Sequence, residues 1–212
     1  MLSPIHTSGK TFRDSNHTVF KYVGVSAFSL FKRWLAPNGP TALVAPILVE
    51  WRELARIGEY TGPIVLRVFR YAHPNNPFGV DPWSYSMNEL TLFTQYCGSQ
   101  GFYVDWTTGD SQVVLPSQSD QQQHLNETCA ALVGVPNAFV QVCNEPFKNG
   151  IDTTVVKPAK WGTYLTSSGY YSDAGVWNHN NDLDFIDFHP DRASDGPNNE
   201  VPKWVGKLFE SG

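Results

Sequence analysis

Apolar residues along this chain follow two alternating patterns. Four continuous apolar runs have the length of strands that are buried on both faces, at 22–28, 62–70, 101–108 and 138–146. Between them, apolar residues recur at the spacing of one helix face, at 45–57, 86–97 and 119–133. This alternation predicts an α/β fold, in which a parallel sheet is connected by crossover helices.

Both ends of the chain extend the pattern. Residues 11–20 predict a hairpin that turns at 14–16, and a hairpin in front of the first buried strand would plug the bottom of a barrel. Two further strands are predicted at 163–169 and 184–189, and a short helix at 201–208. The pattern therefore contains about six strand units.

Capping residues and breakers mark where elements begin and end. Ser86 and Glu89 have the spacing of a capping box, which predicts the start of a helix. Gly58 is placed to end the helix over 45–57. The segment 31–41 predicts a loop, because Pro-Asn-Gly-Pro lies at its centre.

The run over 138–146 ends in a polar pair, Asn144 and Glu145, which Pro146 follows. A buried strand that stops here delivers a carboxyl group to the rim of the sheet. In parallel α/β barrels this C-terminal rim carries the catalytic residues. The pattern favours Glu145 as a catalytic residue, and a carboxylate that pairs with an arginine or caps a helix is the structural alternative.

Two more polar residues occupy strand positions. Arg67 lies within an apolar strand, and because an isolated buried cation is costly, we expect a carboxylate partner beside it. His189 ends the predicted strand over 184–189. The structural alternatives are an ion pair for Arg67 and a core position for His189.

The charge distribution argues against two classes of partner. The net charge is −5 and no cluster of Lys and Arg is present to neutralise phosphates, so we expect no nucleic-acid binding. No apolar run approaches the roughly 20 residues of a membrane helix, so we expect no membrane span. Residues 1–10 lack the apolar core of a signal peptide; either the chain is intracellular or its export signal is missing.

The cysteines and tryptophans indicate which ligands the protein could bind. The three cysteines have neither disulfide nor zinc spacing, so we expect buried free thiols and no metal site. No glycine-rich nucleotide loop occurs, and no cofactor is expected. The seven tryptophans fit a carbohydrate-binding protein, because an indole stacks well on a sugar ring. Trp106, Trp83 and Trp177 are the candidate sugar platforms, with a core position as the alternative for each.

Together, Asn144-Glu145-Pro146 after a buried strand, Arg67 on an earlier strand and His189 on a later one resemble the retaining glycoside hydrolases of clan A. These are (β/α)8 TIM barrels that include the family five cellulases and mannanases. The resemblance implies that Glu145 is the general acid/base and that Asn144 binds the sugar 2-hydroxyl. It also implies that Arg67 keeps the nucleophile ionised and that His189 binds the substrate.

The resemblance has two departures. The aromatic residue that often follows the histidine is replaced by Asp191. The family's nucleophile is a glutamate at the end of strand seven, and strands seven and eight are missing from the six units counted here. We therefore expect residues 1–212 to form one truncated glycosidase-like domain without its nucleophile. A non-catalytic glycan-binding barrel remnant and an inactive fragment are the alternatives, and the sequence leaves the oligomeric state open.

Overall fold

The computed structural model describes residues 2–8, 11–72, 80–152, 155–156 and 165–167. Within these ranges, strands alternate with helices in the order that the apolar pattern predicts. The elements are β1 (His6–Ser8), β2 (Thr11–Arg13), β3 (Val23–Ser26), α1 (Leu30–Trp34), η1 (Gly39–Val44), α2 (Ala45–Ile57), β4 (Ile64–Phe69), α3 (Met87–Ser99), β5 (Phe102–Thr107), α4 (Gln118–Ala131), β6 (Ala138–Gln141), α5 (Pro146–Asn149) and β7 (Leu165–Ser167).

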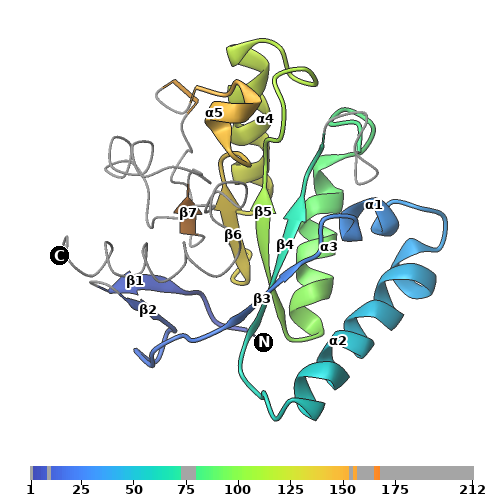
Figure 1. Ribbon diagram of the computed structural model, residues 1–212, viewed down its shortest axis with the longest axis vertical. Coiled ribbons are helices and arrows are strands. Elements are labelled where there is room, and N and C mark those ends of the chain that lie inside the picture. Colours follow the sequence, from blue (N-terminus) through green and yellow to red (C-terminus); the bar gives the residue numbers. More distant parts are fainter. Residues whose placement is uncertain (1, 9–10, 73–79, 153–154, 157–164, 168–212) are drawn as a thin grey trace, which may run out of the picture.

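The central feature is a five-stranded sheet in the order β3-β4-β5-β6-β7 (Figure 1). Every neighbouring pair of its strands is parallel, which confirms the predicted sheet type. Helices α2, α3 and α4 connect successive strands as crossovers. Because all strands run the same way, their C-terminal ends meet at one edge of the sheet, where α5 lies in Figure 1.

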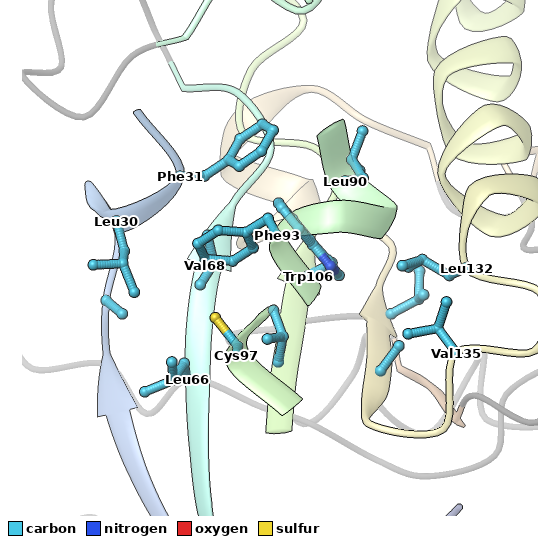
Figure 2. Close-up of a cluster of buried hydrophobic side chains, with 14 of the residues drawn as sticks. Leu30, Phe31, Leu66, Val68, Leu90, Phe93, Cys97, Trp106, Leu132 and Val135 are labelled. Carbon is cyan, nitrogen blue, oxygen red and sulfur yellow. The ribbon is translucent and has the colours of Figure 1, made fainter. Parts of the chain in front are cut away.

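One face of the sheet packs on the helices through apolar side chains (Figure 2). Val68 of β4 and Trp106 of β5 lie opposite Phe93 and Cys97 of α3, and all four are fully buried. Trp106 also donates from Nε1 to the Thr94 hydroxyl at 2.9 Å, which satisfies its one polar group inside the core. Burial of large apolar side chains here stabilises the sheet by about 1.5–3 kcal/mol per residue.

The opposite face is apolar at its N-terminal end, where the start of the chain covers it. Val65, Tyr103 and Phe139 lie side by side there on three strands, and Phe20 packs on Tyr103 with ring centroids 4.9 Å apart. The Tyr103 hydroxyl donates to the Ser3 carbonyl oxygen at 3.0 Å. The N-terminal segment therefore plugs this end of the sheet, and that it plugs the bottom of a closed barrel stays a prediction.

The details of the N-terminal hairpin differ from the prediction. β2 pairs over its length with β1, an antiparallel strand that the apolar pattern did not mark. The predicted turn at 14–16 is present, but only one antiparallel bridge, Arg13 to Val19, follows it. Asp14 explains this compact turn, since its carboxylate accepts hydrogen bonds from the backbone N–H groups of Asn16 and Thr18.

The predicted loop over 31–41 is wrong, because most of it is helical. α1 buries Leu30 and Phe31 against the sheet, and η1 forms one π-helical segment that runs directly into α2. Asn38 adopts a left-handed conformation with φ 56°, which provides the reversal between the two helices. Pro40 lies in the first turn of η1, where its missing N–H costs nothing.

The predicted capping box at Ser86 and Glu89 is also wrong. Ser86 does stand at the N-cap of α3, but its side chain makes no cap hydrogen bond. The Glu89 carboxylate instead accepts from Trp34 Nε1 at 2.8 Å, which ties α3 to α1. A formed side-chain cap occurs at α4, where the Ser117 hydroxyl accepts from the Asp120 backbone N–H.

Several predictions have a simple outcome. The three cysteines are buried free thiols, and α2 has the bounds that its apolar spacing predicted. β7 confirms a strand within 163–169. No helix among the described residues is long and apolar enough to cross a membrane. The predicted strand over 184–189, the helix over 201–208, His189 and Trp177 lie outside the described residues.

Candidate active site

The candidate site lies at the C-terminal edge of the sheet, where β6 ends. Glu145 occupies the N-cap of α5 and has a left-handed backbone conformation, with φ 44° and ψ 61°. Pro146 follows as the first residue of the helix, which restricts the chain on the other side. A non-glycine residue in this conformation costs on the order of 1–3 kcal/mol, and such strain concentrates at functional sites.

Asn144 is held by hydrogen bonds on its backbone and on both ends of its side-chain amide. Its backbone N–H donates to the Gly109 carbonyl oxygen at 2.7 Å, in the loop after β5. Its side-chain Oδ1 accepts from Arg67 Nη2 at 3.0 Å, and its Nδ2 donates to Asp110 Oδ1 at 3.3 Å. These opposite partners define which way the amide faces, so Asn144 presents one orientation at the edge of the sheet.

Arg67 reaches this edge from β4 across the neighbouring strand. Its Cα pairs in register with Asp105 of β5, yet its Nη2 donates to Gln141 Oε1 of β6 at 2.6 Å as well as to Asn144. The rings of Phe28 and Phe69 flank the guanidinium, with their centroids 5.6 and 5.5 Å from Cζ. Among the described residues, Arg67 thus donates to two amide oxygens, and the expected carboxylate partner stays a prediction.

Negative charge gathers close to Glu145. Cys143 is fully buried, and burial is the main cause that raises the pKa of its thiol well above the usual value. The carboxylate of Asp110 raises this pKa further, and that of Glu145 adds to the effect, whereas Arg67 opposes it. The carboxylates of Asp110 and Glu145 and the guanidinium of Arg67 therefore all act electrostatically on the Cys143 thiol, which lies just after β6.

The structure brings together three of the predicted site residues and separates a fourth. Arg67, Asn144 and Glu145 meet at the edge of the sheet. Trp106 has no exposed surface and lies on the helix-facing side, so the prediction of a sugar platform at this residue is wrong. Its alternation with Asp105 already places it on the opposite face from Arg67.

Three site residues were missed by sequence reasoning. Gln141, Thr107 and Asp110 join the hydrogen-bond network that holds Arg67 and Asn144. A signal existed for Gln141, which is the one polar side chain in the apolar run from Ala138 to Cys143. Asp110 belongs to a loop after β5, and nothing in its local sequence points to Asn144.

Trp83 is the exposed tryptophan of the described residues, with 52% of its surface accessible. It lies in the segment between β4 and α3, and its backbone N–H donates to Asp81 Oδ1 at 2.9 Å. One edge of the indole packs against His124, with ring centroids 5.8 Å apart. The ring is therefore held in place while part of it stays open to a ligand.

No group of three or more His, Cys, Asp or Glu side chains that could hold a metal ion occurs in the described part of the chain. The chemistry of the described site is that of carboxylates, an amide and a guanidinium.

Comparisons with known proteins give a result for the fold alone. No family model matches the sequence, and no curated protein matches it. Solved structures do match. A glycoside hydrolase family 5 mannosidase from Rhizomucor miehei aligns with 99% of this chain and 69% of its own, with a TM-score of 0.62 and 12% identity. The chain has a fold like that of glycoside hydrolase family 5.

Two further structures agree with this assignment. An endo-1,4-beta-mannanase from Rhizomucor miehei aligns with 99% of this chain and 78% of its own, with a TM-score of 0.60 and 14% identity. The catalytic domain of an endoglucanase from Thermobifida fusca aligns with 87% of this chain and 63% of its own, with a TM-score of 0.54 and 12% identity. These similarities concern the fold: the parallel sheet and its crossover helices resemble the corresponding part of those structures.

Proposed function

We propose that this chain is a glycoside hydrolase-like protein that acts on O-glycosidic bonds of a β-linked polysaccharide. The observation that carries the proposal is the strained backbone of Glu145 at the end of β6, beside an Asn144 whose amide is held by Arg67 and Asp110. The fold supports it, because the matching structures are named as a mannosidase, a mannanase and an endoglucanase.

In the proposed mechanism, Glu145 is the general acid/base of a retaining reaction. Its carboxylic acid gives a proton to the leaving glycosidic oxygen, and its carboxylate later takes a proton from the attacking water. Asn144 binds the sugar 2-hydroxyl, a contact that strengthens in the transition state. Arg67 supplies positive charge beside the carboxylates of the edge, and His189 completes the substrate contacts.

A retaining reaction also needs a second carboxyl group about 5–5.5 Å from the first, as nucleophile. We propose that the sheet is part of a (β/α)8 barrel to which this chain contributes about six units. On that proposal, the nucleophile is not among the residues of this chain. The acid/base half of the site can then be tested with an external nucleophile.

Azide provides that test with mannohexaose and cellohexaose as substrates. Azide attacks the anomeric carbon from the face opposite the leaving oxygen, the C–O bond breaks, and Glu145 gives its proton to that oxygen. We expect an α-glycosyl azide in the presence of azide, detected by NMR and mass spectrometry. We expect Glu145→Gln to reduce its formation at least about 100-fold, the scale of general acid catalysis.

The matched control is Glu50→Gln, an exposed position on α2 that should leave product formation unchanged. Hydrolysis in plain water with a β-configured product would support the retaining mechanism and place a nucleophile in the chain after all. An α-configured product in plain water would contradict retention. Binding of the hexaoses without any product would favour the non-catalytic glycan-binding alternative, and neither binding nor product would favour an inactive fragment.

A further inference from the structure

We propose that Gln141 is a positioning residue that holds Arg67, and through it Asn144, in the orientation needed at the sugar-binding edge. The inference rests on the proposed function for its biological meaning, but the positioning itself can be measured without any glycan. Gln141 is fully buried and ends β6, on the same face of the sheet as Phe139 below it. A polar side chain at such a position needs a reason, because burying an amide without hydrogen bonds costs about 1–3 kcal/mol.

The side-chain oxygen of Gln141 accepts two hydrogen bonds from two different strands. Arg67 Nη2 of β4 donates to it at 2.6 Å, and the Thr107 hydroxyl of β5 donates at 2.7 Å. Two donors use both lone pairs of the oxygen and fix the direction of the amide. The bond from Arg67 is charge-assisted, which makes it roughly twice as strong as a neutral one.

The backbone of Gln141 is anchored to β5 as well. Its carbonyl oxygen accepts from the Thr108 backbone N–H at 2.9 Å and from the Thr108 hydroxyl at 3.2 Å. Thr107 and Thr108 are themselves fully or almost fully buried. The amide oxygen that faces Arg67 therefore belongs to a rigid part of the sheet, which suits a residue that sets the position of another.

Arg67 needs such a support because its side chain crosses β5 to reach its partners. Its Nη2 group is shared between Gln141 Oε1 and Asn144 Oδ1, at 2.6 and 3.0 Å. Phe28 and Phe69 flank the guanidinium, but a phenyl side chain has no oxygen or nitrogen that could accept a hydrogen bond. Without the Gln141 oxygen, the guanidinium can rotate about its last torsions, and Asn144 loses a fixed donor.

Two substitutions separate the positioning role from simple filling of space. Gln141→Leu keeps a similar volume and removes the acceptor, whereas Gln141→Glu keeps an oxygen at the same place. Gln100→Glu is the control for added charge, at an exposed position after α3 and at the opposite edge of the sheet. Cooperative thermal unfolding of each variant establishes that it is folded.

The first readout is the exchange of the Arg67 guanidinium protons with water, followed by NMR. In the parent chain, and in Gln141→Glu, we expect slow exchange because Nη2 is hydrogen-bonded. In Gln141→Leu we expect exchange to accelerate at least about tenfold, which corresponds to about 1.4 kcal/mol of lost protection. Equal exchange in the parent and Gln141→Leu would overturn the positioning of Arg67 by Gln141.

The second readout is the affinity for mannohexaose and cellohexaose, measured by calorimetry. We expect Gln141→Leu to weaken binding about tenfold and Gln141→Glu to restore it to within about threefold, on the scale of one misplaced polar contact. In an Arg67→Met background, Gln141→Leu should cause no further loss, because its effect passes through Arg67. An equal loss in both backgrounds would show that Gln141 does not act through Arg67.

The two readouts distinguish failure of this inference from failure of the proposed function. If the parent binds neither hexaose, the carbohydrate function is contradicted, and the guanidinium exchange still decides whether Gln141 positions Arg67. If the parent binds the hexaoses and Gln141→Leu changes neither readout, the inference is wrong while the proposed function stands.

Discussion

Two arginines three residues apart, Arg67 and Arg70, stand in different surroundings at the end of β4. Arg70 has no exposed surface, and each nitrogen of its guanidinium has a partner. Its Nε donates to the Tyr85 hydroxyl at 3.0 Å, its Nη1 to the His124 carbonyl and the Thr128 hydroxyl, and its Nη2 pairs with Glu127 at 3.4 Å. Arg70 thus joins β4 to helix α4.

In Arg67, by contrast, only some of the guanidinium's hydrogen-bond donors have a partner among the described residues. Its Nη2 has two amide acceptors, but its buried Nε has no hydrogen-bond partner among the described residues. A saturated buried arginine is typical of a structural role, whereas an arginine with donor capacity left at the open end of a parallel sheet can bind a ligand. The two arginines thus differ in exposure as well as in partner saturation, and on the proposed function Arg67 is the one that takes part in ligand binding.

The largest expected effect is on stability, at Arg70. Arg70→Met should lower the free energy of unfolding by about 3–5 kcal/mol, because it breaks the ion pair with Glu127 and removes the buried guanidinium that donates to Tyr85, His124 and Thr128. Denaturant unfolding followed by circular dichroism measures this. A loss below about 1 kcal/mol would contradict a structural role for Arg70.

Arg67→Met should reduce stability less, and glycan affinity more, than Arg70→Met does. We expect a smaller loss of stability, about 1–2 kcal/mol, because Gln141 keeps its bond from Thr107. The affinity for mannohexaose or cellohexaose should fall at least about tenfold, as for a lost charge-assisted contact. If Arg67→Met proved as destabilising as Arg70→Met and left glycan affinity unaltered, both arginines would be structural.

The region of Arg70 also predicts a pH dependence, through His124. Burial, and secondly the nearby Arg70 charge, lower the pKa of His124 from 6.5 to about 2. Below pH 6.5 the unfolded chain therefore binds a proton that the folded chain excludes until about pH 2, so this residue makes stability fall as the pH falls. At full effect the slope is about 1.4 kcal/mol per pH unit.

His124→Phe removes this linkage. Between pH 6.5 and pH 5 it should lose about 1.7 kcal/mol less stability than the parent chain does, as measured by denaturant unfolding at several pH values. The difference between the two chains, and not the absolute slope, is the test, because carboxylates contribute to both. Parallel curves for the two chains would mean that His124 has the same pKa in the folded and the unfolded chain.

The smallest effect on stability is expected at Trp83, on the exposed side of the Arg70 region. Trp83→Ala should change the free energy of unfolding by less than about 0.5 kcal/mol, because the ring is half exposed. If the glycan extends from Glu145 to this side, affinity for a hexaose should fall about fivefold, on the scale of one stacking contact. Unchanged affinity would confine the glycan to the Arg67 side.

The sequence predicted those parts of the fold that local patterns determine. The parallel strands and the bounds of α2 followed from apolar runs and helical spacing, and Asn144-Glu145-Pro146 indicated the strand end where the candidate site lies. α1 and η1 were missed because Pro-Asn-Gly-Pro is a strong loop signal locally, yet tertiary packing of Phe31 and Val44 makes the chain around it helical.

The site was predicted less completely, because its contacts join residues far apart in the chain. Arg67 meets Gln141 and Asn144, which lie 74 and 77 positions away, and no local pattern encodes that crossing. Glu89 was mistaken for a capping residue because its true partner, Trp34, lies 55 positions away. Trp106 was predicted to contact a sugar, but it lies on the helix-facing side of β5 and is buried in the core. The face of the strand on which a residue lies decides between these two outcomes.

NMR mapping of mannohexaose and cellohexaose on the folded chain tests most directly whether a carbohydrate site lies at the C-terminal edge of the sheet. We predict that backbone shifts concentrate at Gly109, Asp110, Asn144 and Glu145, together with the Arg67 guanidinium. Tyr103 and Phe139 at the plugged end should stay unaffected. Shifts confined to other surfaces, or no shifts at millimolar glycan, would contradict a carbohydrate site at the C-terminal edge of the sheet.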